Sequence, residues 1–191
     1  MNAPLPCPYL QTTRLLLRPL QEQDAEGLWQ LWRSPDFADL AGIDSPSSKD
    51  SIDENISYFK TLNASGFYYK WAITDKQTHE FIGEFELYPI KPQIRPWTEW
   101  GIGFSLTPHR WRQGLMSEAL RCVMQFVFTQ MPAIRVKADV HLHNEASLAL
   151  LRKMGFTQEG IQRSKLHVQG RRHDMHLLAL SQQDFLGSSL T

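Results

Sequence analysis

The sequence has few cysteines and no long hydrophobic run, and both absences narrow the kinds of protein it can be. Only Cys7 and Cys122 occur in 191 residues. They provide neither a disulfide framework nor the spacing of a zinc site, so we expect two free thiols. The most apolar stretch, around residues 122–128, is interrupted by Gln125. It is far shorter than the roughly 20 residues that span a bilayer, so we expect no membrane association.

An excess of charge of either sign is also missing. Twenty Lys and Arg residues balance twenty Asp and Glu residues, so no long-range field favours nucleic acid. The N-terminal stretch has no basic residues before its weakly apolar segment, unlike a secretory signal, and we expect a cytoplasmic protein. The length and a 42% hydrophobic content indicate one globular domain over residues 1–191. We expect residues 1–10 and 186–191 to be flexible termini.

Hydrophobic periodicity predicts a mixture of strands and helices along the whole chain. Asp24 is placed to cap the first helix, which carries Leu28, Trp29 and Trp32 on one stripe. In chain order we expect a strand at residues 14–19, helices at 25–35 and 52–62, strands at 68–74, 80–87 and 97–106, a helix at 114–130, a strand at 136–142, a helix at 145–153, and strands at 156–163 and 172–180.

The segment at residues 108–119 lies between a strand and an amphipathic helix, and it has the features of an anion site. A turn containing Gly114 at a helix N-terminus presents unpaired backbone N–H groups and the positive end of the helix dipole. Arg110 and Arg112 add positive charge. The spacing matches neither a Walker loop nor the dinucleotide fingerprint. Taken alone, the segment favours an ordinary capped helix start with a solvated basic turn.

Three separated segments together resemble the GNAT superfamily of acetyl-CoA-dependent N-acyltransferases. Residues 103–120 resemble its fourth strand, pyrophosphate loop and following helix, and residues 144–160 resemble the next helix and its exit. With residues 14–19, they are most similar to the branch containing the ribosomal-protein N-terminal acetyltransferases RimJ and RimL. The resemblance implies an α/β/α layered fold with a twisted, mainly antiparallel sheet, splayed near Leu106. It implies acetyl-CoA as co-substrate and no metal.

The chain departs from the family pattern at three positions. Trp111 stands where the loop usually has Gln or Arg, and Met116 stands where it usually has Gly or Ala. Leu151 stands where many relatives have a tyrosine that protonates the departing thiolate. The resemblance to the RimL type makes Ser147 the candidate for that acid.

The resemblance implies a role for each site residue. Glu99 is expected to be the general base or an amine-orienting carboxylate, and the backbone N–H of Leu106 is expected to polarise the thioester carbonyl. Ser147 would protonate the coenzyme A sulfur, and Asn144 would contact the pantetheine arm. The expected coenzyme-binding residues are Leu106, Arg112, Gln113, Gly114, Leu115, Met116, Ser117 and Asn144.

Several alternatives stay open. Glu84 and Glu86 alternate on a neighbouring strand and compete with Glu99 for the role of base. Ser147 could bond only a helical carbonyl, and Asn144 could serve as a helix cap. Among the histidines, His141 and His143 would share a strand face, while His173 and His176 lie near each other in the sequence. They lack a recognised metal spacing, and lining a substrate cleft is the favoured interpretation.

We therefore expect an N-acetyltransferase that acts on a primary amine by direct attack in a ternary complex. An α-amino group, with a pKa of about 7.7–8.0, is neutral at pH 7 far more often than lysine at about 10.4, which favours a protein N-terminus. A small-molecule amine such as an antibiotic or polyamine is the first alternative, and a non-catalytic acyl-CoA-binding module is the second. Residues 36–50 and 91–97 would set the acceptor, and a homodimer is left open.

Overall fold

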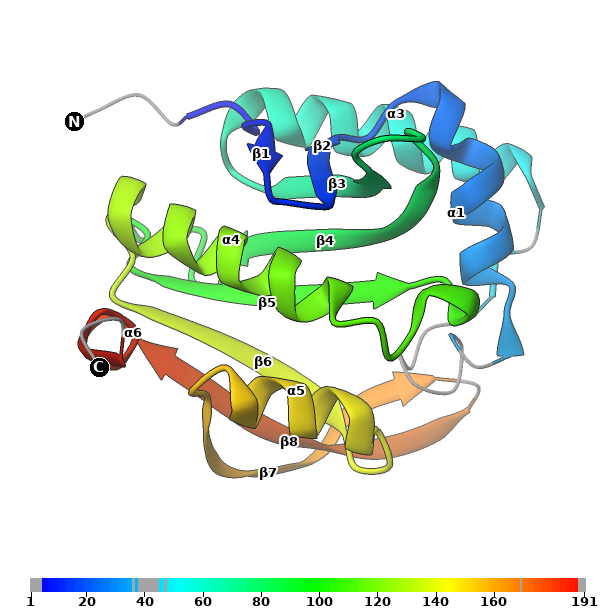
Figure 1. Ribbon diagram of the computed structural model, residues 1–191. Coiled ribbons are helices and arrows are strands. Elements are labelled where there is room, and N and C mark those ends of the chain that lie inside the picture. The colour runs from blue at the N-terminus through cyan, green and yellow to red at the C-terminus, as the bar shows by residue number, and fades with distance from the viewer. Residues whose placement is uncertain (1–4, 36, 38–44, 47, 169, 189–191) are drawn as a thin grey trace.

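The computed structural model describes residues 5–35, 37, 45–46, 48–168 and 170–188, which form one sheet with helices on both faces (Figure 1). Within these residues the strand order is β1-β2-β3-β4-β5-β6-β8-β7, and β5 and β6 are the one parallel pair. The predicted mixed α/β fold with a mainly antiparallel sheet is confirmed. The strands are β1 (Leu10–Gln11), β2 (Leu15–Pro19), β3 (Tyr69–Asp75), β4 (Phe81–Pro89), β5 (Glu99–Leu106), β6 (Arg135–His141), β7 (Thr157–Val168) and β8 (Arg171–Ser181).

The helices divide between the two faces of the sheet. Helices α4 (Leu115–Gln130) and α5 (Glu145–Lys153) cover the face seen in front in Figure 1, and α1 (Ala25–Trp32) and α3 (Asp50–Ser65) belong to the other. Gly66 ends α3 with a φ of 64°, as the sequence predicts. Two 3₁₀ turns, η1 (Glu22–Asp24) and η2 (Pro108–Arg110), and the C-terminal helix α6 (Gln182–Ser188) complete the described elements.

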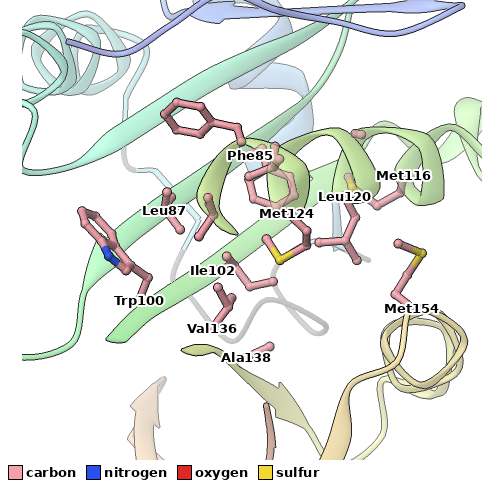
Figure 2. Close-up of a cluster of buried hydrophobic side chains, with 14 of the residues drawn as sticks. Phe85, Leu87, Trp100, Ile102, Met116, Leu120, Met124, Val136, Ala138 and Met154 are labelled. Carbon is pink, nitrogen blue, oxygen red and sulfur yellow. The ribbon is translucent and has the colours of Figure 1, made fainter. Parts of the chain in front are cut away.

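The larger hydrophobic core lies between α4 and the sheet. Alternate residues of β3, β4 and β5 point toward this helix, and Trp71, Phe85 and Trp100 are each at most 1% exposed. Figure 2 shows Leu120 and Met124 of α4 among these side chains. Full burial of each large apolar side chain contributes about 1.5–3 kcal/mol, so this face holds α4 and the turn before it firmly in place.

The opposite face combines a smaller apolar core with buried charges. Its apolar part joins Leu28 of α1 and Ile56 of α3 to Ala72 of β3. On the same face Arg18 donates to both carboxylate oxygens of Asp24, at 2.7 and 2.8 Å. Asp24 was predicted to cap α1, but its carboxylate is occupied by Arg18 and makes no cap hydrogen bond to the helix, so that prediction is wrong.

Strands β5 and β6 pair over only a short stretch and then separate. Their ladder runs from Glu99 opposite Arg135 to Gly101 opposite Lys137. Beyond it the two strands diverge toward the ends at which α4 and α5 begin (Figure 1). The predicted splay of the sheet near Leu106 is confirmed, and the strands separate next to the segment that leads into α4.

The described residues nearest the two ends of the chain belong to the folded structure. Residues 5–8 are tied to the sheet, since Tyr69 Oη donates to Leu5 O and Trp71 Nε1 donates to Pro8 O. Residues 186–188 belong to α6. Most of the segment 36–50, which was predicted to set acceptor choice, lies outside the described residues. No helix in the described part of the chain is both long and apolar enough to cross a membrane.

Candidate active site

The segment at residues 111–117, here called the α4 turn, leaves a row of backbone amides without protein acceptors. Gly114 has a φ of 74° and Arg112 a φ of 58°, so the chain reverses tightly before α4. The first α4 amide that donates to a backbone carbonyl is that of Glu118, to Gly114 O at 3.1 Å. Among the described residues, nothing accepts from the amides of residues 113–117. These amides and the positive helix end suit a phosphate group.

Arg14, at the start of β2, fixes the α4 turn from outside. Its guanidinium donates to Gln113 O at 3.0 Å and to Glu118 Oε2 at 2.7 Å, while its own amide donates to Glu118 Oε1 at 2.8 Å. Burial opposes ionisation of Glu118, but hydrogen bonds from Thr12 and Arg14 outweigh it and lower the pKa of Glu118. The sequence placed Arg14 only in a strand, because nothing local connects it to a turn about 100 residues away.

The end of β5 meets the α4 turn at Leu106. Trp111 Nε1 donates to Leu106 O at 2.7 Å, so the tryptophan at the departing position of the family pattern ties the turn to the strand. Thr107 donates to Ile82 O across the antiparallel ladder with β4. Since bonding direction alternates along such a ladder, the amide of Leu106 points away from β4 and toward the gap beside β6.

A cavity of about 440 Å³ occupies this gap. It extends from the α4 turn past the end of β5 to α5, and residues near the end of α1 also border it. The cavity brings together the eight expected coenzyme-binding residues and Ser147. Its lining includes Leu31, Ser34, Phe37, Phe104, Ser105, Leu106, Arg110, Trp111, Arg112, Gln113, Gly114, Leu115, Met116, Ser117, Asn144, Ala146, Ser147 and Leu150.

Asn144 and Ser147 form the start of α5 at the far side of the cavity. Asn144 Oδ1 accepts from Ser147 N at 3.0 Å, which caps the helix. The Ser147 hydroxyl has no hydrogen-bond partner in the described part of the chain, so it does not bond a helical carbonyl. It therefore keeps a donor for a group inside the cavity.

Leu151 and Met116, two departures from the family pattern, are buried in the core. Leu151 is 0% exposed, and its neighbour Leu150 lines the cavity instead. Met116, in the first turn of α4, is 8% exposed and belongs to the buried cluster that Figure 2 shows. Neither side chain takes a polar group into the cavity, and the Met116 side chain leaves the amides of the turn accessible.

Glu99, the expected base, lies away from the cavity. It begins β5, at the opposite end from Leu106, a separation of about 23 Å at ~3.3 Å per residue. Its carboxylate accepts from Arg135 Nε at 3.1 Å, and the same guanidinium also binds Glu159. The structure therefore places Glu99 in an ion-pair network at the paired end of β5 and β6, apart from the other expected site residues.

The competing carboxylates, Glu84 and Glu86, belong instead to a charged cluster with Tyr68 and Lys70 on the face opposite α4. The Lys70 ammonium lies 3.0 Å from Glu84 Oε2 and 3.0 Å from Glu86 Oε2. Tyr68 Oη donates to Glu86 Oε2 at 2.5 Å, and Trp32 Nε1 donates to Glu84 Oε1 at 3.1 Å. Sequence inspection had singled out the two carboxylates but not their phenol and ammonium partners.

Burial and mutual attraction set the ionisation of the charged cluster. Burial opposes the Lys70 ammonium, but the two carboxylates outweigh it and raise the pKa of Lys70. Burial raises the pKa of Glu84. For Glu86, burial is outweighed by the Lys70 charge and by the Tyr68 and Lys70 hydrogen bonds, which lower its pKa. Of the two carboxylates, Glu86 is therefore the one whose surroundings favour the ionised form.

Of the four histidines singled out in the sequence, His141 lies on β6, and His173 and His176 lie on β8. His143 lies in the turn after β6, so it does not share a strand face with His141 as expected. His141 Nε2 lies 2.9 Å from His173 Nδ1, and the His143 ring is 5.4 Å from that of His141. His176 instead contacts Gln158. No set of three His, Cys, Asp or Glu residues in the described segments is arranged to hold a metal ion.

Comparison with known proteins agrees with this geometry. The family described as acetyltransferase (GNAT) domain matches residues 14–157. The uncharacterized N-acetyltransferase YoaA of Bacillus subtilis is 30% identical over 91% of this chain and 96% of its own. Spermidine N-acetyltransferase from Vibrio cholerae, solved with CoA and spermine, has a TM-score of 0.78 at 18% identity, covering 92% of this chain and 99% of that one.

A further structural neighbour is RimL, the ribosomal L7/L12 alpha-N-protein acetyltransferase, solved in complex with coenzyme A. Its TM-score is 0.76 at 22% identity, with 91% of this chain and 98% of that chain covered. Together with the family match over most of the sequence, these likenesses agree with the fold and its splayed sheet. The chain belongs to the GNAT family and is an N-acetyltransferase.

Proposed function

We propose that the protein transfers the acetyl group of acetyl-CoA to a primary amine by direct attack in a ternary complex. The observation that carries this proposal is the row of unpartnered amides at residues 113–117, which faces a cavity bordered by the splayed strands. Backbone amides at a helix N-terminus fit a diphosphate. Their position beside the gap lets the rest of the coenzyme run between β5 and β6.

The residues around the gap have different roles in binding the coenzyme and in the transfer reaction. The α4 turn binds the diphosphate, and Asn144 contacts the pantetheine arm. The Leu106 amide, which points toward the gap, donates to the thioester oxygen as negative charge develops there. The Ser147 hydroxyl donates its proton to the departing sulfur, so the free thiol of coenzyme A is released.

The preferred acceptor is an α-amino group at a protein N-terminus. At pH 7 an α-amine is neutral a few hundred times more often than a lysine side chain, so it needs less help from a base. Among the structural neighbours, RimL is named for an α-N-protein acceptor and the Vibrio cholerae enzyme for spermidine. The sequence identity to YoaA, whose acceptor is not named, supports the reaction type rather than one acceptor.

An acceptor screen with thiol detection tests this function. Acetyl-CoA is mixed with the protein and either N-terminal peptides or small amines, and we expect thiol release that depends on the amine and is fastest with peptides. Ser147→Ala should lower kcat about 10²- to 10⁴-fold and leave the dissociation constant of coenzyme A unchanged. Coenzyme binding without thiol release from any amine would instead identify a non-catalytic binding module.

A further inference from the structure

The charged cluster shares a sheet face with one wall of the coenzyme cavity. Glu84 pairs with Ser105 and Glu86 pairs with Gly103 across the β4–β5 ladder. Residues paired in this way point to the same face, and Ser105 also lines the cavity. The cavity therefore reaches around the end of β5 to the face on which the two carboxylates stand.

The two carboxylate oxygens of Glu86 differ in their hydrogen bonds to the described residues. Oε2 accepts from Tyr68 Oη at 2.5 Å and from Lys70 Nζ at 3.0 Å. Oε1 has no hydrogen-bond partner in the described part of the chain, and the side chain is 27% exposed. Glu84 is different, because its side chain is only 7% exposed and lies beneath Trp32.

Gly103 makes room for the free oxygen. A Cβ at this position would stand 2.4 Å from Glu86 Oε1, so any other residue would push the carboxylate away. The neighbouring Gly101 gives the same room to the Tyr88 ring, which a Cβ would meet at 2.4 Å. The two glycines let side chains from β4 lie across β5, close to where β5 leaves β6.

We propose that Glu86 Oε1 binds and orients the amine of the acceptor, with Lys70 and Tyr68 as positioning residues. This proposal rests on the proposed function and names its acceptor subsite. The carboxylate is supplied from β4 across a glycine of β5, rather than from Glu99 on β5 itself. The group it takes is a primary amine carrying one positive charge at the reacting nitrogen.

The ionisation of Glu86 decides what it does to the amine. An ionised carboxylate attracts an ammonium group and accepts its N–H, which raises acceptor affinity and aims the nitrogen. The ammonium loses one proton to water, and its lone pair forms the C–N bond to the thioester carbon. The second proton leaves the nitrogen for water as the C–S bond breaks. The thiolate takes a proton from Ser147, and the Ser147 oxygen regains a proton from water. The products are the acetamide, the free thiol and one net proton.

Lys70 limits the kind of acceptor that fits. Its ammonium already neutralises one of the two carboxylate charges, at 3.0 Å from each. A second ammonium close to the reacting nitrogen, as in a short diamine, would meet this buried positive charge. The cluster therefore favours an acceptor with a single ammonium at this end.

The test compares Glu86→Gln with wild type in the thiol-release assay on an N-terminal peptide. Loss of a hydrogen bond to a charged group should lower kcat/KM for the amine about 10- to 100-fold, mainly through KM. The dissociation constant of coenzyme A should not change. A carboxylate raises the pKa of a bound amine, so the rising limb of kcat against pH should move to lower pH in Glu86→Gln.

Two further variants separate this role from a structural one. Gly103→Ala keeps every charge but displaces Glu86 Oε1, and it should raise the amine KM in the same way. Glu159→Gln, a half-exposed carboxylate beside Arg135, is the matched control and should behave as wild type. Thermal midpoints of all variants check that they are folded.

The outcomes distinguish this inference from the function it rests on. An active wild type with Glu86→Gln equally active overturns the role of Glu86 alone. If Glu99→Gln lowers kcat/KM for the amine and Glu86→Gln does not, the role of Glu86 is also overturned, and Glu99 on β5 is the residue that orients the amine. A wild type that releases no thiol with any amine removes the proposed function, and the subsite with it.

Discussion

The two faces of the sheet carry two different kinds of polar site, one built from backbone amides and the other from charged side chains. On the α4 side, the proposed coenzyme site consists of the backbone amides of residues 113–117, and most side chains there pack in the core. On the opposite side, the charged cluster of Tyr68, Lys70, Glu84 and Glu86 is made of side-chain contacts between β3 and β4. The first site depends on the backbone conformation of the α4 turn, and the second depends on hydrogen bonds and ion pairs between side chains.

This difference predicts which amino-acid substitutions each side of the sheet can accommodate. Replacing a side chain in the α4 turn leaves the amides in place, as Met116 and Trp111 illustrate at positions where the family has other residues. Replacing a member of the charged cluster leaves its partners buried without compensation. We expect the coenzyme side to be sensitive to backbone geometry and the cluster to be sensitive to charge.

Removal of the Lys70 ammonium should give the largest effect. Lys70→Met leaves Glu84 and Glu86 buried without their cation, which should lower the free energy of unfolding by about 3–5 kcal/mol. Urea unfolding at pH 7 measures the loss. Lys60→Met is the control, because Lys60 pairs with Glu22 in solvent and should change stability little.

The same variant has a pH signature with a defined sign. The folded pKa of Glu86 is lowered, so its stabilising contribution is present above the unfolded pKa of about 4.3 and is lost as the pH falls through the folded pKa. The difference between wild type and Lys70→Met should therefore shrink below about pH 4.3. A difference that stayed constant down to pH 3 would contradict the charge-based account of this face.

The two sides also differ in how far the sequence predicts them. The α4 turn is local, since a glycine, a helix start and the preceding strand follow one another in the chain. The charged cluster needs the strand register, and β3 has an irregularity between Ile73 and Thr74. Counting back from the hairpin turn without that shift would place Lys70 opposite Phe85, whereas the structure pairs it with Glu86. A one-residue slip exchanges the faces of a strand, so the cluster is not visible in the sequence.

Glu99 and Arg14 are two more residues whose roles could not be predicted from the sequence. Glu99 was expected to be the base or an amine-orienting carboxylate, but the parallel pairing with β6 puts it beside Arg135, at the closed end of the splay. Arg14 was seen only as a strand residue, but it holds the α4 turn through contacts about 100 residues away in sequence. Both roles depend on which segments are neighbours in the folded sheet. The spacing of hydrophobic residues along the sequence does not give this information.

A change of backbone geometry should give the next effect. Gly114→Ala forces a Cβ into a φ of 74°, which costs about 1–2 kcal/mol. If the turn relaxes to relieve this strain, its amides move and the dissociation constant of coenzyme A should rise about tenfold, the equivalent of ~1.4 kcal/mol. Calorimetric titration with coenzyme A measures it. Gly160→Ala, with nothing within 4 Å of its Cβ position, is the matched control and should bind as wild type.

The smallest effect should come from the Arg14–Glu118 ion pair beside the α4 turn. Glu118 is held by Arg14, and its lowered pKa means that its contribution is present above about pH 4.3 and disappears as the pH falls through the folded value. Glu118→Gln should cost less than about 1 kcal/mol at pH 7, because the pair is partly exposed and screened. Urea unfolding at pH 7 and pH 3 should show this small loss only at the higher pH. A loss as large as that of Lys70→Met would mean that the α4 turn also depends on side-chain charge, and the contrast between the two faces would fail.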